Sequence, residues 1–579
     1  MSAKGLRLLP LFPIEAEPYP QQKAALSALK KWLLGDKKFA LMRAPTGIGK
    51  SAIAITMGRA SAQLGSGCFI LTAKKFLQEQ YITEYPEVGL ANLWGKSNYP
   101  CTLAASEGLT RNCGQCILAK AKDTRGRRGK MAWCSKNCPY ILAKNAAIGS
   151  KLSLANFESF LYNQEYANEC FGTRKLLIVD EAHLLPDRLS SFASMEIRVF
   201  YEDIGEAINN APKNTTAVSL ANWISTDLKP AIQSQLDDLE SVMKEAEVED
   251  IPEMEGVTFV SDLMKEAMSE PKDELARLTR VQENLTRAER YIDSNPANWA
   301  VDIGVDKKAE LIVLHLRPIT LAAAGEMYLY RHFDKVLLIS ATMDTGPYVK
   351  DIGVAPADIG TFIEVPSVFK LPTRPLLFTP VGSMSRKNVD ATLPKAAKAL
   401  DDILRRHHGE RGIIHTRSFA LAKNLRDAMS DYGRSRCLFH TDNSVNIQGW
   451  VARLKKSPGK WLVSPSCTEG LDGKGDLVRG QVILKVSYPY LGDSRVAGRK
   501  AMPDGDMWYT MQAIYDFMQA YGRGTRSKTD YSVTYVLDSS ANSLIRRGTK
   551  YLPKWFVETW NKSNVRNWVF VKGRWILRT

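Results

Sequence analysis

The chain has 579 residues, of which 45% are hydrophobic and 24% charged, a composition that excludes a disordered or collagen-like protein. Its length predicts about three to five structural units. With 78 lysines and arginines against 62 aspartates and glutamates, the net charge of +16 favours contact with a polyanion such as nucleic acid. No apolar stretch approaches the roughly 20 residues of a membrane span, and Pro10 and Pro13 interrupt the N-terminal apolar stretch. We therefore expect a cytoplasmic protein without a secretory signal or a membrane partner.

The first part of the chain is expected to be an α/β unit. Helical periodicity runs over residues 21–34, and a short apolar strand is predicted over 39–42. After a glycine-containing loop, a helix is predicted over 52–60, then a strand over 68–71 and a helix over 72–81. This alternation of strands and helices predicts a parallel sheet.

The character of the chain changes between about residues 94 and 144, where a basic stretch has little strand pattern. It contains five of the nine cysteines, at Cys101, Cys113, Cys116, Cys134 and Cys138. A reducing cytosol disfavours structural disulfides, so the cluster indicates a metal or iron–sulfur site in an insertion held together by its ligands. Thiolates suit either Zn²⁺ or an iron–sulfur cluster, and the spacing alone favours zinc.

The sheet pattern resumes with a strand predicted over 176–180. A long helical and charged stretch follows, from about 185 to 305, and its acidic run at 231–256 indicates a solvated lobe or an acidic linker. A buried strand is expected over 336–339. A second α/β domain is predicted over about 362–538, with strands at 412–415, 461–464, 482–486 and 532–537.

A phosphate-binding loop is predicted from Ala44 to Ser51, which reads APTGIGKS with alanine at the usual first glycine. It follows a predicted strand and opens a predicted helix, which is the context that the motif requires. Gly47 and Gly49 would let the backbone approach the phosphates. Lys50 would contact the β and γ phosphates, and the Ser51 hydroxyl would ligate Mg²⁺. A glycine-rich turn with a chance lysine is the plain alternative.

Adjacent carboxylates, Asp180 and Glu181, begin a DEAH tetrapeptide at the end of the strand predicted over 176–180. Asp180 would hold Mg²⁺, directly or through water, and Glu181 would orient and polarise the attacking water. Alone, the tetrapeptide could be a surface turn; beside the phosphate loop, it predicts nucleotide hydrolysis. Arg523 and Arg526, on a predicted helix of the second domain, would neutralise charge on the γ-phosphate, with a solvated basic helix face as the alternative.

Together these motifs resemble the superfamily 2 helicases of the XPD/DinG type. In the family's order, the similar stretches are 19–22 (glutamine motif, with Gln22 reading adenine), 71–80 (motif Ia), Asn156 before motif II, 340–343 (motif III), 412–418 (motif IV), 468–476 with Asp472 (motif V) and 519–526 with Gln519 (motif VI). The resemblance spans about residues 19–538.

The resemblance implies an α/β fold with two RecA-like parallel-sheet motor domains, an iron–sulfur cluster insertion and a mainly helical arch insertion. The expected boundaries are 1–93, 146–186 and 311–350 for the first motor domain, 94–145 for the cluster insertion, 187–310 for the arch and 351–579 for the second motor domain with its tail. ATP and Mg²⁺ would bind between the motors, at Gln22, Ala44, Pro45, Thr46, Gly47, Gly49, Lys50, Ser51, Asp180, Glu181, Asp472, Gln519, Arg523 and Arg526.

The resemblance also implies a [4Fe–4S] cluster. Its expected ligands are Cys101, Cys113, Cys116 and Cys138, with Cys134 as a substitute for the last. The ordered insertion would then grip a strand near the duplex junction; a basic loop with a structural metal is the alternative. The candidates for stacking unpaired bases, some of which are expected to be ordinary core residues, are Trp94, Tyr99, Trp133, Tyr140 and Phe157.

We therefore expect a monomeric ATP-dependent DNA helicase that acts on single-stranded DNA and duplex junctions. Its 5′→3′ polarity is implied by the resemblance alone. RNA or an RNA–DNA hybrid is an alternative track, and either a cellular repair pathway or a mobile element is a compatible setting. The alternative function is an ATP-gated nucleic-acid-binding module that recruits or clears a partner without unwinding. No N-terminal exonuclease is expected, because the stretch before residue 19 leaves no room for one.

Overall fold

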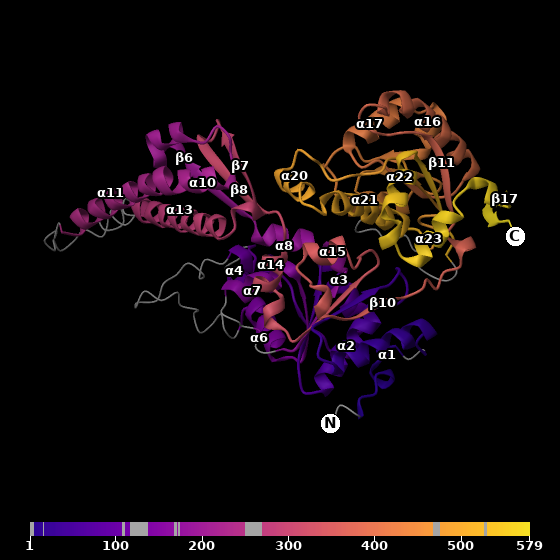
Figure 1. Cartoon of the computed structure of the whole chain (residues 1–579), viewed down its shortest axis with the longest axis horizontal. Coiled ribbons are helices and arrows are strands. Elements are labelled where there is room, and N and C mark those ends of the chain that lie inside the picture. Colours follow the sequence, from indigo (N-terminus) through magenta and orange to yellow (C-terminus); the bar gives the residue numbers. More distant parts are fainter. Residues whose placement is uncertain are drawn as a thin grey trace. The chain divides into compact units, whose positions relative to one another are not determined.

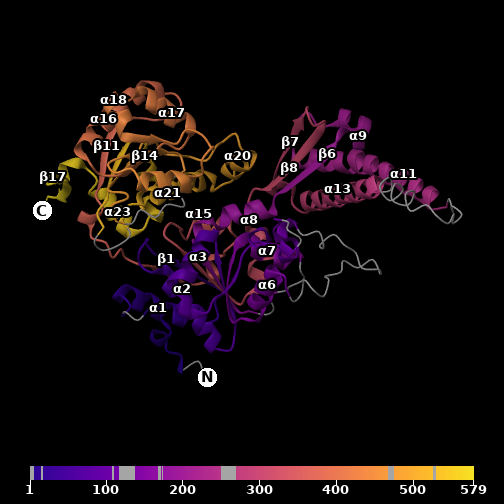
Figure 2. The same cartoon turned by 180° about the vertical axis from the view of Figure 1, so that it is seen from behind.

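The computed structural model describes residues 5–14, 17–106, 110–115, 137–166, 171, 174–248, 269–466, 475–525 and 530–578. The chain divides into two compact units. The first contains Met1–Arg188, Ala322–Pro489 and Asp504–Thr579, and the second contains Leu189–Leu321 and Tyr490–Pro503. Figures 1 and 2 show the elements of both units from opposite sides. Within the described residues, no helix combines the length and the apolar character needed to cross a membrane.

The first unit contains a seven-stranded sheet in the order β10-β1-β9-β5-β2-β4-β3, in which neighbouring strands are parallel. Its central strands are short apolar runs with every residue buried, as expected where helices cover both faces of a parallel sheet. The strands are β1 (Phe39–Arg43), β2 (Cys68–Thr72), β3 (Ala91–Leu93), β4 (Leu152–Asn156), β5 (Leu176–Asp180), β9 (Lys335–Ser340) and β10 (Ile359–Glu364).

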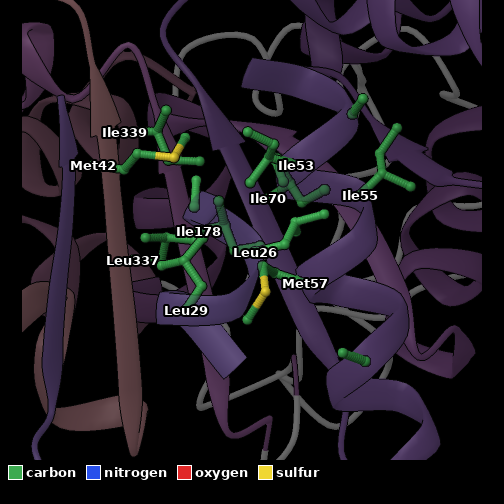
Figure 3. Packing of buried hydrophobic residues seen from close by; sticks show 14 of the residues in the cluster. Leu26, Leu29, Met42, Ile53, Ile55, Met57, Ile70, Ile178, Leu337 and Ile339 are labelled. Atoms are coloured by element: carbon green, nitrogen blue, oxygen red, sulfur yellow. The ribbon is translucent and has the colours of Figure 1, made fainter. Parts of the chain in front are cut away.

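Helices α1 and α2 pack on this sheet through a common hydrophobic core (Figure 3). Leu26 and Leu29 come from α1, Ile53 and Met57 from α2, and Ile178 from β5. The helices of this part of the unit are α1 (Pro20–Leu34), α2 (Lys50–Gln63), α3 (Lys75–Glu84), α4 (Thr102–Ser106), α6 (Pro139–Gly149), α7 (Phe157–Tyr166), α14 (Ala322–Tyr328) and α15 (Pro347–Asp351). Helix α8 (Leu185–Ala193) contains the boundary between the two units.

A second parallel sheet has six strands in the order β11-β16-β15-β12-β14-β13. The strands are β11 (Leu376–Gly382), β12 (Gly412–His415), β13 (Cys437–Phe439), β14 (Trp461–Ser464), β15 (Gly480–Ile483) and β16 (Val533–Asp538). The helices are α16 (Val389–Arg406), α17 (Phe419–Ala428), α18 (Asp431–Arg436), α19 (Ile447–Lys455), α21 (Gly505–Tyr521), α22 (Ser540–Gly548) and α23 (Lys554–Asn561). The two parallel sheets confirm the predicted α/β fold with two RecA-like domains.

The C-terminal tail adds an antiparallel hairpin to the second of these domains. Its strands are β17 (Trp568–Val571) and β18 (Arg574–Leu577). Trp568 and Trp575 are buried in the core of the six-stranded sheet, so these tail tryptophans pack the tail against the domain.

The second unit combines helices with a three-stranded antiparallel sheet in the order β6-β8-β7. The strands are β6 (Met195–Phe200), β7 (Trp299–Asp306) and β8 (Leu311–Pro318). The helices are α9 (Tyr201–Ile204), α10 (Ala217–Trp223), α11 (Lys229–Val248), α13 (Ser269–Ser294) and α20 (Ser494–Lys500). The helices of this lobe agree with the sequence-based prediction, but the sheet is not predicted. In β6 only every second residue is buried, and such a short alternation is a weak indication of a strand beside long helical periodicity.

Two strands join sheets other than those that the expected boundaries suggest. β8 lies in the stretch expected to return to the first motor domain, but it pairs with β6 and β7. β10 lies in the stretch expected to open the second motor domain, but it pairs with β1 at the edge of the seven-stranded sheet. Residue patterns indicate that a strand exists without identifying the strand beside it.

Candidate nucleotide site and cysteine cluster

The predicted phosphate-binding loop connects β1 to α2. The Ala44 N–H donates to the carbonyl of Ser340 at 2.8 Å, so the loop starts next to the end of β9. Gly47 and Gly49 have φ angles of 79° and 78°, a left-handed conformation that explains glycine at both positions. Lys50 is the first residue of α2, so the free N–H groups of that helix face the loop.

Gln22 of α1 braces this loop. Its Nε2 donates to the carbonyl of Ile48 at 2.8 Å, and its Oε1 accepts from the Tyr19 N–H at 2.7 Å. A Cβ atom at Gly49 would lie 2.6 Å from Nε2, so that glycine is also required by space. Gln22 therefore contacts the loop itself, and its expected contact with adenine stays a prediction.

The carboxylates of the DEAH tetrapeptide lie beside the loop. Asp180 ends β5 and is 3% exposed. Glu181 has a φ of 52°, and its Oε1 accepts from the Lys50 Nζ at 3.0 Å. The His183 Nδ1 lies 3.3 Å from the other oxygen of Glu181 and 3.0 Å from the Ser340 hydroxyl. Lysine, both carboxylates and histidine thus form one polar cluster.

The two carboxyl groups have opposite pKa shifts. Burial, together with the charge of Glu181, raises the pKa of Asp180 to about 6. Burial acts in the same direction on Glu181, but the Lys50 ammonium and the His183 imidazole outweigh it and hold the pKa of Glu181 well below its usual range. Glu181 is therefore the stronger acid of the pair, and Asp180 is the carboxylate that takes up a proton first as the pH falls.

Tyr81 of α3 belongs to the same cluster, and the sequence analysis did not identify it. Its hydroxyl donates to the Asp180 Oδ2 at 2.8 Å in a buried position. A tyrosine on the inner face of a helix usually packs in a core, so its sequence position gives no signal of this contact.

A cavity of about 360 Å³ opens over these groups. Its volume lies within the usual range of small-molecule sites. Gln519 and Arg523, at the end of α21 and just after it, line the cavity together with the loop and both carboxylates. The Gln519 Nε2 donates to the Thr342 hydroxyl at 3.2 Å, and Arg523 donates to the Gln519 Oε1 at 3.4 Å. The lining residues that the sequence predicted are Thr46, Gly47, Gly49, Lys50, Ser51, Asp180, Glu181, Gln519 and Arg523.

The other predicted nucleotide-site residues lie elsewhere. Gln22 is buried behind the loop, and Ala44 and Pro45 precede the part of it that lines the cavity. Asp472 and Arg526 fall outside the described residues.

The described part of the cysteine cluster contains three thiols, those of Cys101, Cys113 and Cys138. The Cys101 N–H donates to the carbonyl of Arg111, and the Cys113 N–H donates to that of Tyr99, each at 2.9 Å. These two backbone hydrogen bonds hold the segments that carry the two cysteines side by side. Cys138 directly precedes α6, and its Sγ lies 3.6 Å from the Sγ of Cys113. Cys116 and Cys134 fall outside the described residues.

These thiols have the chemistry of a site for a soft metal. Burial and the neighbouring Cys138 raise the pKa of the Cys113 thiol to about 12. Two thiols in contact would both ionise only if a cation offset their charges. Among the described residues, however, no group of three or more histidine, cysteine, aspartate or glutamate side chains is arranged to hold a metal ion. The described thiols fit part of the predicted sulfur-ligand set, and the predicted ligand Cys116 and its companion Cys134 fall outside the described residues, so the ligand set stays a prediction.

Two residues of the family-like stretches, Gln78 and Asn156, have structural contacts within the fold. Gln78, within the motif Ia stretch, is fully buried, and its Nε2 donates to the Asn92 Oδ1 at 2.7 Å and to the carbonyl of Leu93 at 3.1 Å. The Asn156 Oδ1 accepts from the Ser159 N–H at 2.7 Å, at the start of α7. Residues 467–474, which include most of the motif V stretch, fall outside the described residues.

The aromatic candidates for base stacking are mostly buried. Tyr99, Tyr140 and Phe157 are buried in the fold. Trp94 is half-buried, and the Lys75 ammonium lies 5.1 Å from the centre of its ring. Trp133 falls outside the described residues. Trp94 is thus the one described candidate whose ring is not fully enclosed.

Comparison with known protein families supports the assignment of the two motor domains. Residues 15–218 match a family model described as the res subunit of type III restriction enzymes, and residues 402–559 match one described as a helicase C-terminal domain. No curated protein matches the chain.

The fold is similar to those of solved XPD structures. A structure of S. tokodaii Xpd4 has a TM-score of 0.50 at 14% identity and covers 91% of this chain and 96% of its own. A structure titled XPD helicase has a TM-score of 0.57 at 13% identity, with 93% and 99% covered. A third, titled XPD apo, has a TM-score of 0.51 at 14% identity, with 92% and 99% covered. At these identities the structures establish the fold alone.

The family models match stretches of both motor domains, and the fold is similar to that of XPD structures over nearly the whole chain. Both findings agree with the sequence resemblance to the superfamily 2 helicases of the XPD/DinG type. The match to a helicase C-terminal domain supports an ATP-dependent helicase.

Proposed function

We propose that this protein is an ATP-dependent DNA helicase that moves 5′→3′ along single-stranded DNA. The cavity shared by the phosphate loop, the DEAH carboxylates and Arg523 carries the proposal. A loop and carboxylates alone would support nucleotide hydrolysis. An arginine from the second domain at the same cavity supports hydrolysis that depends on closure of the two domains. The DNA track and the polarity rest on the family resemblance.

In the proposed hydrolysis step, Lys50 changes its partner. In the structure, Lys50 donates to Glu181. The phosphates of ATP would draw Lys50 to themselves and release Glu181 to orient the attacking water. Asp180 and Ser51 would hold Mg²⁺, which when bound neutralises phosphate charge. Arg523 would stabilise the charge that develops on the γ-phosphate.

A line of polar contacts leads from the carboxylates to the second domain. His183 lies beside both Glu181 and Ser340, and the Ser340 hydroxyl accepts from the Thr342 N–H at 3.2 Å. Thr342 in turn accepts from Gln519. We propose that these contacts transmit the loss of the γ-phosphate from the carboxylates to α21 and change the position of that helix.

The cysteine cluster is proposed to hold a [4Fe–4S] cluster through Cys101, Cys113, Cys138 and Cys116, with Cys134 as a substitute for Cys138. The three described thiols support this ligand set, and the helicase context favours iron over zinc. The cluster would order the basic insertion, and a reducing cytoplasm would keep the thiols available for it.

A variant that separates ATP binding from hydrolysis tests the proposal. Glu181→Gln should retain binding of a fluorescent ATP analogue but lose DNA-stimulated hydrolysis, because an amide cannot orient and polarise water as a carboxylate does. Glu196→Gln is the matched control, since Glu196 is an exposed carboxylate on β6, and it should behave as the wild type. DNA-stimulated hydrolysis by Glu181→Gln at the wild-type rate would contradict the assigned role.

A further inference from the structure

The hydroxyl of one buried tyrosine donates to Asp180 and lies within reach of Ser51, the two side chains that are proposed to hold Mg²⁺. Tyr81 is 2% exposed and donates to the Asp180 Oδ2 at 2.8 Å. The same hydroxyl lies close enough to Ser51 for the two to interact. Asp180 comes from β5, Ser51 from α2 and Tyr81 from α3. A third element thus links the two proposed metal ligands.

The contact leaves the Asp180 carboxylate free to bind a cation. Its Oδ1 accepts from the Glu181 N–H at 2.9 Å, and its Oδ2 accepts from Tyr81 at 2.8 Å. An ionised carboxylate has about four acceptor positions, so about two stay open. Donors on both oxygens fix the plane of the carboxylate, as hydrogen-bonding partners commonly do for metal ligands.

The helix that carries Tyr81 is itself held in place. One turn before Tyr81, the buried Gln78 donates to Asn92 and Leu93 of β3. The rings of Tyr81 and Tyr85 also lie in contact, with centroids 6.5 Å apart. The position of the Tyr81 hydroxyl is therefore set by a helix fastened to the sheet.

We propose that Tyr81 is a positioning residue that holds Asp180 and Ser51 in the arrangement that binds Mg²⁺. The inference rests on the proposed ATPase function. It assigns to Tyr81 a contribution to metal affinity, with little effect on the chemical step once the metal is bound.

The test compares Tyr81→Phe, which removes one oxygen atom, with Tyr330→Phe. Tyr330 is equally buried, but its hydroxyl has no hydrogen-bond partner among the described residues. Tyr81→Phe should raise the Mg²⁺ concentration for half-maximal ATP hydrolysis about tenfold. Its kcat at saturating Mg²⁺ should stay within about twofold of the wild type. Tyr330→Phe should match the wild type in both.

Nucleotide binding gives a second readout that needs no turnover. With Mg²⁺ present, Tyr81→Phe should bind a fluorescent ADP analogue about tenfold more weakly than the wild type. In EDTA the two proteins should bind it equally, because the phosphate loop is unchanged.

Three results would overturn the inference. Wild-type Mg²⁺ dependence in Tyr81→Phe would show that the hydroxyl does not position the ligands, and a loss of kcat that excess Mg²⁺ does not restore would show a different role. Both leave the proposed function standing. Nucleotide binding and hydrolysis by the wild type that need no Mg²⁺ would instead remove Asp180 and Ser51 as metal ligands, and the proposed ATPase mechanism with them.

Discussion

Replacing Lys50 by alanine should abolish DNA-stimulated ATP hydrolysis and also destabilise the nucleotide-free protein. The second effect follows from the ion pair with Glu181, whose nitrogen and oxygen lie 3.0 Å apart. The Lys50 side chain is 9% exposed and that of Glu181 is 22% exposed, so the pair is largely shielded from water. Its removal leaves a buried carboxylate with His183 as its remaining basic partner.

The expected cost is about 2–3 kcal/mol in free energy of unfolding. Breaking a fully buried pair by removing one partner costs about 3–5 kcal/mol. The residual exposure of Glu181 and its contact with His183 place this site below that range. For a domain of this size, 1 kcal/mol corresponds to about 2–4 °C in the unfolding midpoint. Lys50→Ala should therefore lower the midpoint by about 4–12 °C at neutral pH.

The loss should depend on pH in a definite direction. The native state holds the pKa of Glu181 well below its usual 4.5, mainly because Lys50 and His183 outweigh the effect of burial. Such a group contributes stability above its unfolded pKa and loses it as the pH falls through the folded value. The difference between the wild type and Lys50→Ala should thus be largest near pH 7 and shrink below about pH 4.5.

Thermal unfolding without nucleotide, measured between pH 4 and pH 8, checks this expectation. Lys175→Ala is the matched control, because Lys175 pairs with Asp334 at 3.6 Å with both side chains more than half exposed. It should change the stability by less than about 0.5 kcal/mol. Equal midpoints for Lys50→Ala and the wild type at pH 7 would show that the ion pair between Lys50 and Glu181 does not stabilise the protein. Near-normal ATP hydrolysis by Lys50→Ala would refute the phosphate loop.

Three further predictions concern other parts of the chain. Arg277→Ala should destabilise the second unit by about 3 kcal/mol. The reason is that the Asp203 carboxylate is 3% exposed and accepts hydrogen bonds from both terminal nitrogens of Arg277, one of them at 2.7 Å. Unfolding in denaturant at the wild-type midpoint would contradict this. Arg317→Asp should loosen α20, measured by hydrogen exchange, and adding Asp493→Arg should restore protection, because these side chains form an ion pair; failure of the second change to restore protection would count against a direct pair. Cys113→Ser should remove bound iron and absorption near 400 nm; retained absorption would mean that the ligands lie elsewhere.

The sequence predicts best where a motif adjoins a continuous apolar strand. The strand predicted over 176–180 is β5 residue for residue, and the strand predicted over 39–42 is β1 with Arg43 added. Each strand leads directly into a recognisable motif, so both the apolar pattern of the strand and the motif itself indicate where the strand ends. The strand predicted over 482–486 is observed over Gly480–Ile483, because glycine at its start hides the first residues from a hydrophobic pattern.

The contacts that tune the site were beyond a sequence-based prediction. Tyr81 reaches Asp180 across 99 residues of chain, and Gln22 reaches the carbonyl of Ile48 across 26. No sequence pattern around a tyrosine or a glutamine predicts a contact with a residue so far along the chain. The sheet of the second unit was equally hard to predict. The composition of the acidic run indicates a solvated lobe, but it gives no sign of the β6-β8-β7 sheet, which depends on pairing between strands about 100 residues apart.

Strand separation on partial duplexes with a 5′ or a 3′ single-stranded tail tests the central claim most directly. The protein would be purified anaerobically and assayed for iron and zinc, with Lys50→Ala as the inactive control. We expect ATP-dependent unwinding from the 5′ tail only, by protein with about four irons per chain. DNA-stimulated ATP hydrolysis without strand separation from either tail would contradict it and favour an ATP-gated module that binds or clears nucleic acid.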